Sequence, residues 1–262
     1  PVAGCAVTHR LEAMIGIGTI TNVVAIVIGG LIGVALGGKF PERTSRTVMD
    51  GAGIAVLVLG GLNIMSLMDA DYVAAVSGAG TFLIVVVSVV FGGAIGSMLN
   101  LEERIAGLGG FLHTKFSGGS NDNAKRARFI DGFVNASLIM AVGPMGILGA
   151  LSDGMGQGAD TLFLKSLLDF IGSIAFGASM GIGVAASAVS VGLWQGLVTA
   201  FGAVVGAGIP TAYIASITAT GGILMIGIGL RLLNIRQIAI ADLLPALLIA
   251  PLLTWGVSAV IA

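Results

Sequence analysis

The chain alternates between long apolar runs and short interruptions that are polar or rich in glycine and proline. A helix needs about 20 predominantly apolar residues to cross the hydrocarbon core of a bilayer. By this rule the pattern predicts eight membrane-spanning helices. They cover residues 15–37, 48–68, 73–99, 130–151, 161–181, 184–206, 211–232 and 239–261.

One boundary between these spans is not marked by polar residues. The chain carries no charged residue from Ile171 to Val205, and this run is too long for a single span. Its middle reads Gly181-Ile182-Gly183, and glycine tolerates the backbone conformations of tight turns. We therefore expect two helices joined by a glycine turn.

The composition, together with this pattern, indicates the fold class. Of the 262 residues, 56% are apolar and 10% are charged, and the mean hydropathy is +1.06, whereas soluble domains carry about 25% charged residues. The sequence therefore predicts an all-α polytopic integral membrane protein embedded in the lipid bilayer. The net charge of −1 gives no electrostatic reason to expect a nucleic-acid partner, and the single cysteine excludes an internal disulfide framework.

Basic residues suggest an orientation. Eight spans place ten of the twelve Lys and Arg residues on one face, and positive residues favour the cytoplasmic side. Both termini are then expected outside the cytoplasm. The ten are Lys39, Arg43, Arg46, Arg104, Lys115, Lys125, Arg126, Arg128, Arg231 and Arg236.

The chain outside the spans falls into two parts. Residues 100–129 form a cytoplasmic segment that begins with an amphipathic helical pattern and continues as a basic tether. Residues 1–14 have no apolar core long enough for a signal peptide. We interpret them as a leader or a non-native remnant, and residues 15–262 as a single transmembrane domain.

An internal repeat is indicated at an offset of about 168 residues. GTITNVVAIVIGGLIGVALGG (18–38) aligns with residues 186–206, and DGAGIAVLVLGGLNI (50–64) aligns with residues 218–232. The first trio of spans, 15–99, thus resembles the last trio, 184–261, around a two-helix centre. The two trios would have opposite orientations in the bilayer, and inverted repeats of this kind recur in transporters. Glycine-aliphatic helices also match one another easily, so chance similarity is the alternative.

Several blocks together resemble a known family. They are GTITNVVAIVIGGLIG, PERT, DGAGIAVLVLG, GPMGILGALSDG, KSLLDFIGSIAF and TATGGILMIGIGLRLL, in this order. The sequence resembles the bacterial membrane family called domain of unknown function 554, the YdfK/YqgA-like proteins, over about residues 16–255. The resemblance implies a multi-pass protein of the bacterial inner (plasma) membrane. It implies no reaction, substrate or set of site residues.

Ionisable residues inside a span are costly and mark a functional hypothesis. Asp169 lies about 12 Å into the span 161–181, at 1.5 Å per residue, and Lys165 precedes it by one helical turn on the same face. The pair is interpreted as part of a substrate or ion path. The alternative is a structural ion pair in which Lys165 extends to the membrane surface.

A backbone break lies near this pair in the sequence. Proline inside a helix removes a backbone donor, so Gly143-Pro144 predicts a broken helix, which is tolerated where protein or a water-filled cavity satisfies the backbone. Asn135 and Ser137 could line such a cavity, and Asp153 would lie at its outer mouth. A simple kink filled by neighbouring helices is the alternative.

Small and hydroxyl residues occupy other spans. Thr19 and Asn22 in the first predicted span, and Thr218 and Thr220 in the seventh, could line the path or hydrogen-bond neighbouring helices. Gly29, Gly33 and Gly37 form a small-residue ridge, as do Gly92 and Gly96. These ridges predict close helix packing within the chain or between the subunits of a homo-oligomer.

Enzyme chemistry is not indicated. Gly177-Ala178-Ser179-Met180-Gly181 matches GxSxG, but this pattern requires a strand-turn-helix and a histidine base. Both histidines, His9 and His113, are expected outside the membrane, and His113 on a solvated surface. No cofactor or metal site is expected. The sequence therefore predicts a membrane transporter or channel for a small ion or solute. The alternative is a non-transporting membrane scaffold that associates through glycine-rich helix faces.

Overall fold

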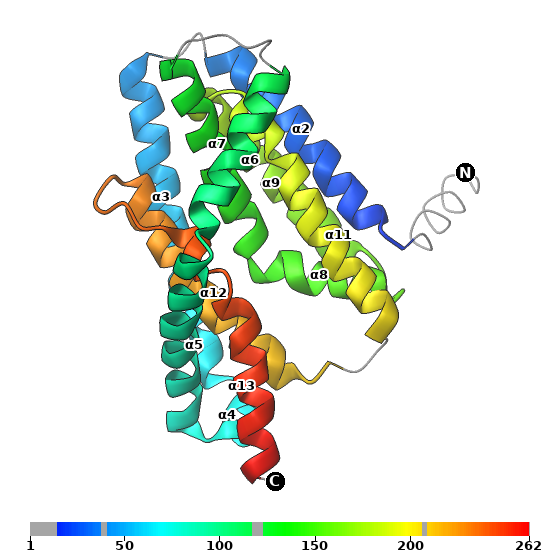
Figure 1. Cartoon of the computed structure of the whole chain (residues 1–262). Helices are drawn as coiled ribbons and strands as arrows, with labels where there is room; N and C mark the ends of the chain where they lie inside the picture. The colour runs from blue at the N-terminus through cyan, green and yellow to red at the C-terminus, as the bar shows by residue number, and fades with distance from the viewer. Residues whose placement is uncertain (1–14, 38–40, 117–122, 206–208, 262) are drawn as a thin grey trace, which may run out of the picture. The chain divides into compact units, whose positions relative to one another are not determined.

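The computed structural model describes residues 15–37, 41–116, 123–205 and 209–261, and these residues form helices and no strands (Figure 1). The α-helices are α2 (Ile17–Gly37), α3 (Glu42–Ile64), α4 (Ala70–Val76), α5 (Gly78–Met98), α6 (Leu101–Phe116), α7 (Asn123–Val142), α8 (Pro144–Gly154), α9 (Asp160–Met180), α10 (Gly183–Ala186), α11 (Ala188–Val205), α12 (Thr211–Leu232) and α13 (Ala246–Ile261). Two 3-10 helices, η1 (Met65–Met68) and η2 (Ile240–Leu243), precede α4 and α13.

Seven helical segments in the described part of the chain are long and apolar enough to cross a bilayer. They cover residues 17–37, 46–68, 78–98, 160–180, 183–204, 211–232 and 240–261. An eighth candidate is a bent pair, residues 123–141 and 145–154, whose halves meet at 63°. The chain is therefore an all-helical polytopic membrane protein with about eight spans.

The third predicted span begins later than the sequence suggested. A separate short helix, α4, ends at Val76, and the φ of 67° at the following Ser77 lies in the left-handed region. Such a φ is uncommon for a residue other than glycine and interrupts the helix. The span itself, α5, therefore begins at Gly78 and not at residue 73.

The chain divides into two compact units. Unit 1 contains residues 1–46, 109–141 and 145–208, and unit 2 contains residues 47–108, 142–144 and 209–262. Unit 1 thus holds α2, α9, α10, α11 and nearly all of the bent pair α7–α8. Unit 2 holds most of α3 together with α4, α5, α12 and α13.

In unit 1, α2 and α9 pack in parallel along their length. Gly18 faces Leu162, Gly29 faces Phe170, and Gly37 faces Ala178, so both helices advance together. A Cβ on Gly29 would lie 2.5 Å from the Phe170 carbonyl oxygen, and Gly33 and Gly37 would meet the α9 backbone in the same way. These glycines let the two backbones touch.

The bent pair runs the whole length of α9 in the opposite direction. Near the start of α7, Gly132 packs on Met180 at the end of α9, whereas Gly149 of α8 packs on Leu162 at the beginning of α9. The two halves therefore cover one full span between them. A re-entrant loop would return to the end from which it started, so these contacts favour a break within a single span.

The helices α9 and α11 are joined by the expected glycine turn. Gly181 has a φ of 86°, where side chains are disfavoured, and the short helix α10 leads into α11. Close pairs between α2 and α11 join Thr19 to Thr199 and Val23 to Gly192. These two helices are therefore antiparallel.

In unit 2, α3 and α12 cross in antiparallel fashion at a pair of glycines. A Cβ on Gly60 would lie 2.8 Å from the Gly222 oxygen, and a Cβ on Gly222 would lie 2.7 Å from the Gly60 oxygen. Gly92 and Gly96 likewise face the backbone of Ala246 and Asp242, which brings α5 onto α13 and η2.

Candidate functional site

A buried ion pair lies inside α9. Lys165 Nζ donates to Asp169 Oδ2 one turn further along the helix. The two side chains are only 6% and 12% exposed. The structure thus places the pair within the packed part of unit 1, where an unpaired charge would be costly.

Two amide side chains join this pair from neighbouring helices. Asn22 Nδ2 donates to Asp169 Oδ2 at 3.0 Å and to Gln195 Oε1 at 3.0 Å. Asn22 and Gln195 are fully buried. The four residues therefore form one polar cluster in which α2, α9 and α11 meet.

The cluster has unused hydrogen-bonding capacity. Asn22 Oδ1 and Gln195 Nε2 are buried and have no hydrogen-bond partner. Among the described side chains, Asn135 Oδ1 and Trp194 Nε1 are also buried without a partner. Buried polar atoms are nearly always hydrogen-bonded, since an unsatisfied group costs about 1–3 kcal/mol. A polar ligand or a water molecule beside the ion pair could donate to the Asn22 oxygen and accept from the Gln195 nitrogen.

The broken span contributes to the cluster through Gly146. A Cβ there would lie 2.9 Å from Lys165 Cε and 3.4 Å from Gln195 Nε2. Gly146 follows the predicted break at Gly143-Pro144 by two residues, so α8 approaches the cluster directly after the bend. Gly143 itself faces open space, because an added Cβ would meet nothing within 4 Å.

A second polar layer lies one turn closer to the beginning of α2. The hydroxyls of Thr19 and Thr199 are 3.1 Å apart. Asp153 is buried, and its two carboxylate oxygens accept the backbone N–H groups of Gly16 and Gly18 at 3.0 and 3.2 Å. Asp153 thus satisfies backbone N–H groups that the first turn of α2 leaves unpaired, as a capping residue does.

The other predicted path residues are distributed more widely. Ser137 Oγ lies 2.5 Å from Ser190 Oγ, which links α7 to α11. Thr218 and Thr220 belong to unit 2, where Thr220 Oγ1 donates to the Ser216 carbonyl oxygen at 2.7 Å. Of the predicted residues, the structure therefore brings Asp169, Lys165 and Asn22 into one hydrogen-bonded cluster.

Sequence reasoning missed Gln195 and Gly146. Gln195 is a lone amide in an apolar span, and polar residues in spans mark sites, so that signal was present. Gly146 carried no signal of its own, because glycine is frequent throughout the chain. Its role depends on which side chains α8 meets after the bend.

The expectation for His113 was wrong. The histidine is only 4% exposed, and its ring packs edge-on against Phe129, with 5.2 Å between the ring centroids. Its position in the predicted cytoplasmic segment 100–129 favours a solvated surface. In the fold, the end of α6 lies against the start of α7, and this contact covers the ring.

Among the described residues, no group of three or more His, Cys, Asp or Glu side chains is placed so that it could hold a metal ion. The polar cluster instead offers one carboxylate, one ammonium group and two amides. Such a set can bind and release a small polar species or a proton.

Comparisons with known proteins identify relatives. A family model described as "Protein of unknown function (DUF554)" matches residues 17–255. The "Uncharacterized membrane protein YdfK" of Bacillus subtilis (strain 168) is 31% identical over 92% of this chain and 97% of its own length. The "Uncharacterized protein YqgA" of Escherichia coli (strain K12) is 28% identical over 89% and 94%, respectively. No solved structure matches the chain significantly.

Proposed function

Because the chain belongs to the DUF554 family, whose description assigns no activity, we propose from its own polar cluster that it is a membrane transporter or channel for a small ion or solute. We place it in the bacterial inner membrane with both termini outside the cytoplasm, on the distribution of its basic residues.

The observation that carries the proposal is the buried ion pair with unsatisfied neighbours. Lys165 and Asp169 lie within a candidate span, and Asn22 Oδ1 and Gln195 Nε2 next to them lack partners. Ionisable groups at such positions mark ion and substrate paths in membrane proteins. A purely structural pair would be expected to have its polar neighbours satisfied.

The broken span supports the same proposal. Transporters commonly build their sites from discontinuous helices at mid-depth, and α8 brings Gly146 onto Lys165 directly after the 63° bend. Lys165 and Asn22 are almost inaccessible, so the site is closed in this conformation. Transport then requires a rearrangement of helices, which favours a carrier over an open pore.

The scaffold alternative receives less support from the predicted glycine ridges. Gly29, Gly33 and Gly37 contact α9 within the chain, and Gly92 and Gly96 contact Ala246 and Asp242. These faces are occupied by the protein's own helices. A scaffold would have to associate through other surfaces.

The test compares two substitutions in α9. Asp169→Asn removes the buried charge, and Asp160→Asn makes the same change at an exposed position in the first turn. The purified variants are reconstituted in liposomes, and movement of H⁺, Na⁺ and K⁺ is followed under imposed gradients. We expect Asp169→Asn to lose the flux that the wild type and Asp160→Asn share.

Water access provides the second readout. In a Cys5→Ser background, Gly146→Cys is treated with a small water-soluble thiol reagent. A transporter exposes this position while it cycles, so the cysteine should react. If the wild type moves none of the three ions and position 146 stays unreactive in the bilayer, the site is a dry structural element and the proposal is wrong.

A further inference from the structure

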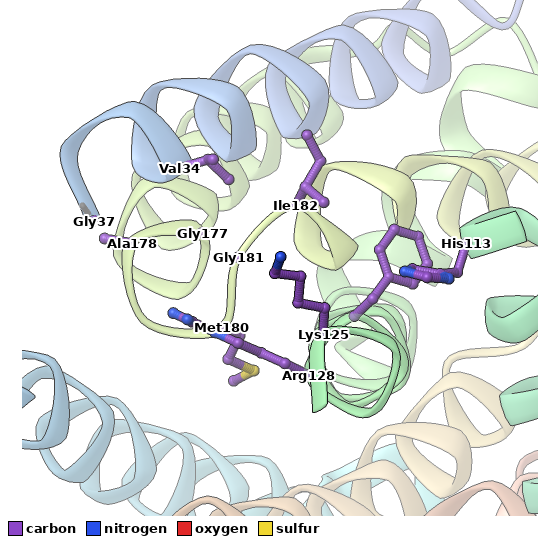
Figure 2. Close-up of a pocket in the computed structure, with 11 residues that line it drawn as sticks. Val34, Gly37, His113, Lys125, Arg128, Gly177, Ala178, Met180, Gly181 and Ile182 are labelled. Carbon is purple, nitrogen blue, oxygen red and sulfur yellow. The ribbon is translucent and has the colours of Figure 1, made fainter. Parts of the chain in front are cut away.

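A cavity of about 370 Å³ lies in unit 1, apart from the polar cluster. It lies between the end of α2, the beginning of α7 and the turn that follows α9 (Figure 2). None of the four cluster residues is among the described residues that line it. Its chemistry is therefore independent of the proposed transport path.

The described residues that line the cavity carry positive charge and no carboxylate. Lys125 and Arg128 extend from the first turns of α7 toward the turn at Gly181 (Figure 2). His113 lies with its ring against that of Phe129. Lys125 and Arg128 are exposed. The positive end of the α7 dipole adds to their charge, so the cavity favours an anion.

One hydrogen bond holds Arg128 at the cavity. Arg128 Nη2 donates to the Ser179 carbonyl oxygen near the end of α9 at 2.9 Å. A guanidinium has five N–H donors in a fork that suits phosphate oxygens, so this bond orients the group without exhausting it. The bond also occupies a carbonyl whose negative end would otherwise repel an anion.

The rest of the lining is apolar. Val34 comes from α2, Ala178 from α9, and Ile182, which is 46% exposed, comes from the turn. Both helices are candidate spans, and the cavity lies at their ends. A cationic edge beside an apolar wall at the end of two spans matches the position of a lipid headgroup above its acyl chains.

We propose that this cavity binds a phosphate-bearing anion, supplied either by the headgroup of an anionic phospholipid or by soluble phosphate. Lys125 and Arg128 hold the phosphate, and His113 contributes a ring N–H. Val34 and Ile182 form the apolar wall beside the bound group. The site would tie α2, α7 and α9 together at one surface of the membrane.

The experiment measures binding of short-chain phosphatidylglycerol, and separately of inorganic phosphate, to the full chain purified in detergent and stripped of lipid. Lys125→Ala with Arg128→Ala removes both cations from the cavity. The matched control, Lys115→Ala with Arg126→Ala, removes the same charge from exposed residues that do not line it. Val34→Trp fills the cavity and leaves the charge unchanged.

We expect the cavity double variant to weaken binding of phosphatidylglycerol about 30-fold, since each basic residue near a lipid surface contributes about 1 kcal/mol. Val34→Trp should also weaken it, while the control keeps the wild-type affinity. Binding of phosphatidylglycerol alone identifies a lipid site, and competition by inorganic phosphate identifies a soluble anion. The proposal is overturned if the wild type binds neither probe. It is also overturned if the control variant loses as much affinity as the cavity variant and Val34→Trp has no effect.

Discussion

At the scale of single residues, burying the charges of Lys165 and Asp169 is the step that costs most free energy. Desolvating two charges is expensive, and their attraction compensates only when the geometry is good and further hydrogen bonds are present. Asn22 supplies one such bond to Asp169 Oδ2. The pair is therefore tolerable while it is intact, and either partner alone would be an uncompensated buried charge.

This cost predicts the behaviour of two variants. Asp169→Leu leaves the Lys165 ammonium buried without its partner and should lower the free energy of unfolding by about 3–5 kcal/mol. The combination Lys165→Met with Asp169→Leu removes both charges and should recover most of that loss. Thermal unfolding in detergent measures the difference. Equal destabilisation in the single and double variants would show that the two charges do not interact.

At the scale of helices, contact between α2 and α9 depends on the absence of side chains. Gly29, Gly33 and Gly37 recur every four residues and so share one face of α2, and each lies against the backbone of α9. In lipid, helices associate through packing and not through exclusion of water. Close approach of the two backbones is therefore the main interaction that stabilises the pairing of α2 with α9. It also brings Asn22 next to Asp169.

A substitution at the centre of this ridge tests the point. Gly33→Val places atoms where the Ile174 carbonyl oxygen lies, and overpacking of this kind costs about 1–3 kcal/mol or more. We expect a lower melting temperature in detergent. Gly61→Ala in α3 is the control, because nothing lies within 4 Å of the added Cβ and the change should be neutral or stabilising by up to about 1 kcal/mol. If both variants melt alike, the ridge does not hold the helices together.

At the scale of the whole molecule, the bent pair determines the topology. Because α7 and α8 together run the full length of α9, we count them as one crossing. Eight crossings would return the chain to the side on which it began. The parallel packing of α2 and α9 agrees with this count. Three crossings lie between these two helices, and an odd number of intervening crossings makes two spans run in the same direction. The inverted repeat stays a prediction, although α2 with α11, α3 with α12 and α5 with α13 each share a unit and pack in antiparallel fashion.

Labelling of intact cells tests this topology. In a Cys5→Ser background, cysteines at Gln157 and Val260, which are exposed, should react with a membrane-impermeant maleimide from outside. A cysteine at Lys125 should react only after the cells are permeabilised. Labelling at residues 125 and 157 from the same side would mean that the bent pair re-enters the membrane, which contradicts eight crossings.

Hydropathy alone determined which segments of this protein enter the bilayer, because the cost of placing a residue in lipid depends mainly on that residue and its neighbours in sequence. The same local reasoning identified the break at Gly143-Pro144 and singled out Lys165 and Asp169, since a missing backbone donor and a charge in an apolar span are visible in the sequence. The glycine turn at Gly181 was also found in this way.

Only the tertiary structure decided which of these features meet. Asn22 and Gln195 lie 173 positions apart, and their pairing depends on how α2 and α11 cross. The burial of His113, the capping of α2 by Asp153 and the approach of Gly146 to Lys165 likewise arise from contacts between distant segments. Such contacts depend on the shapes and angles of packed helices, which no window of sequence contains.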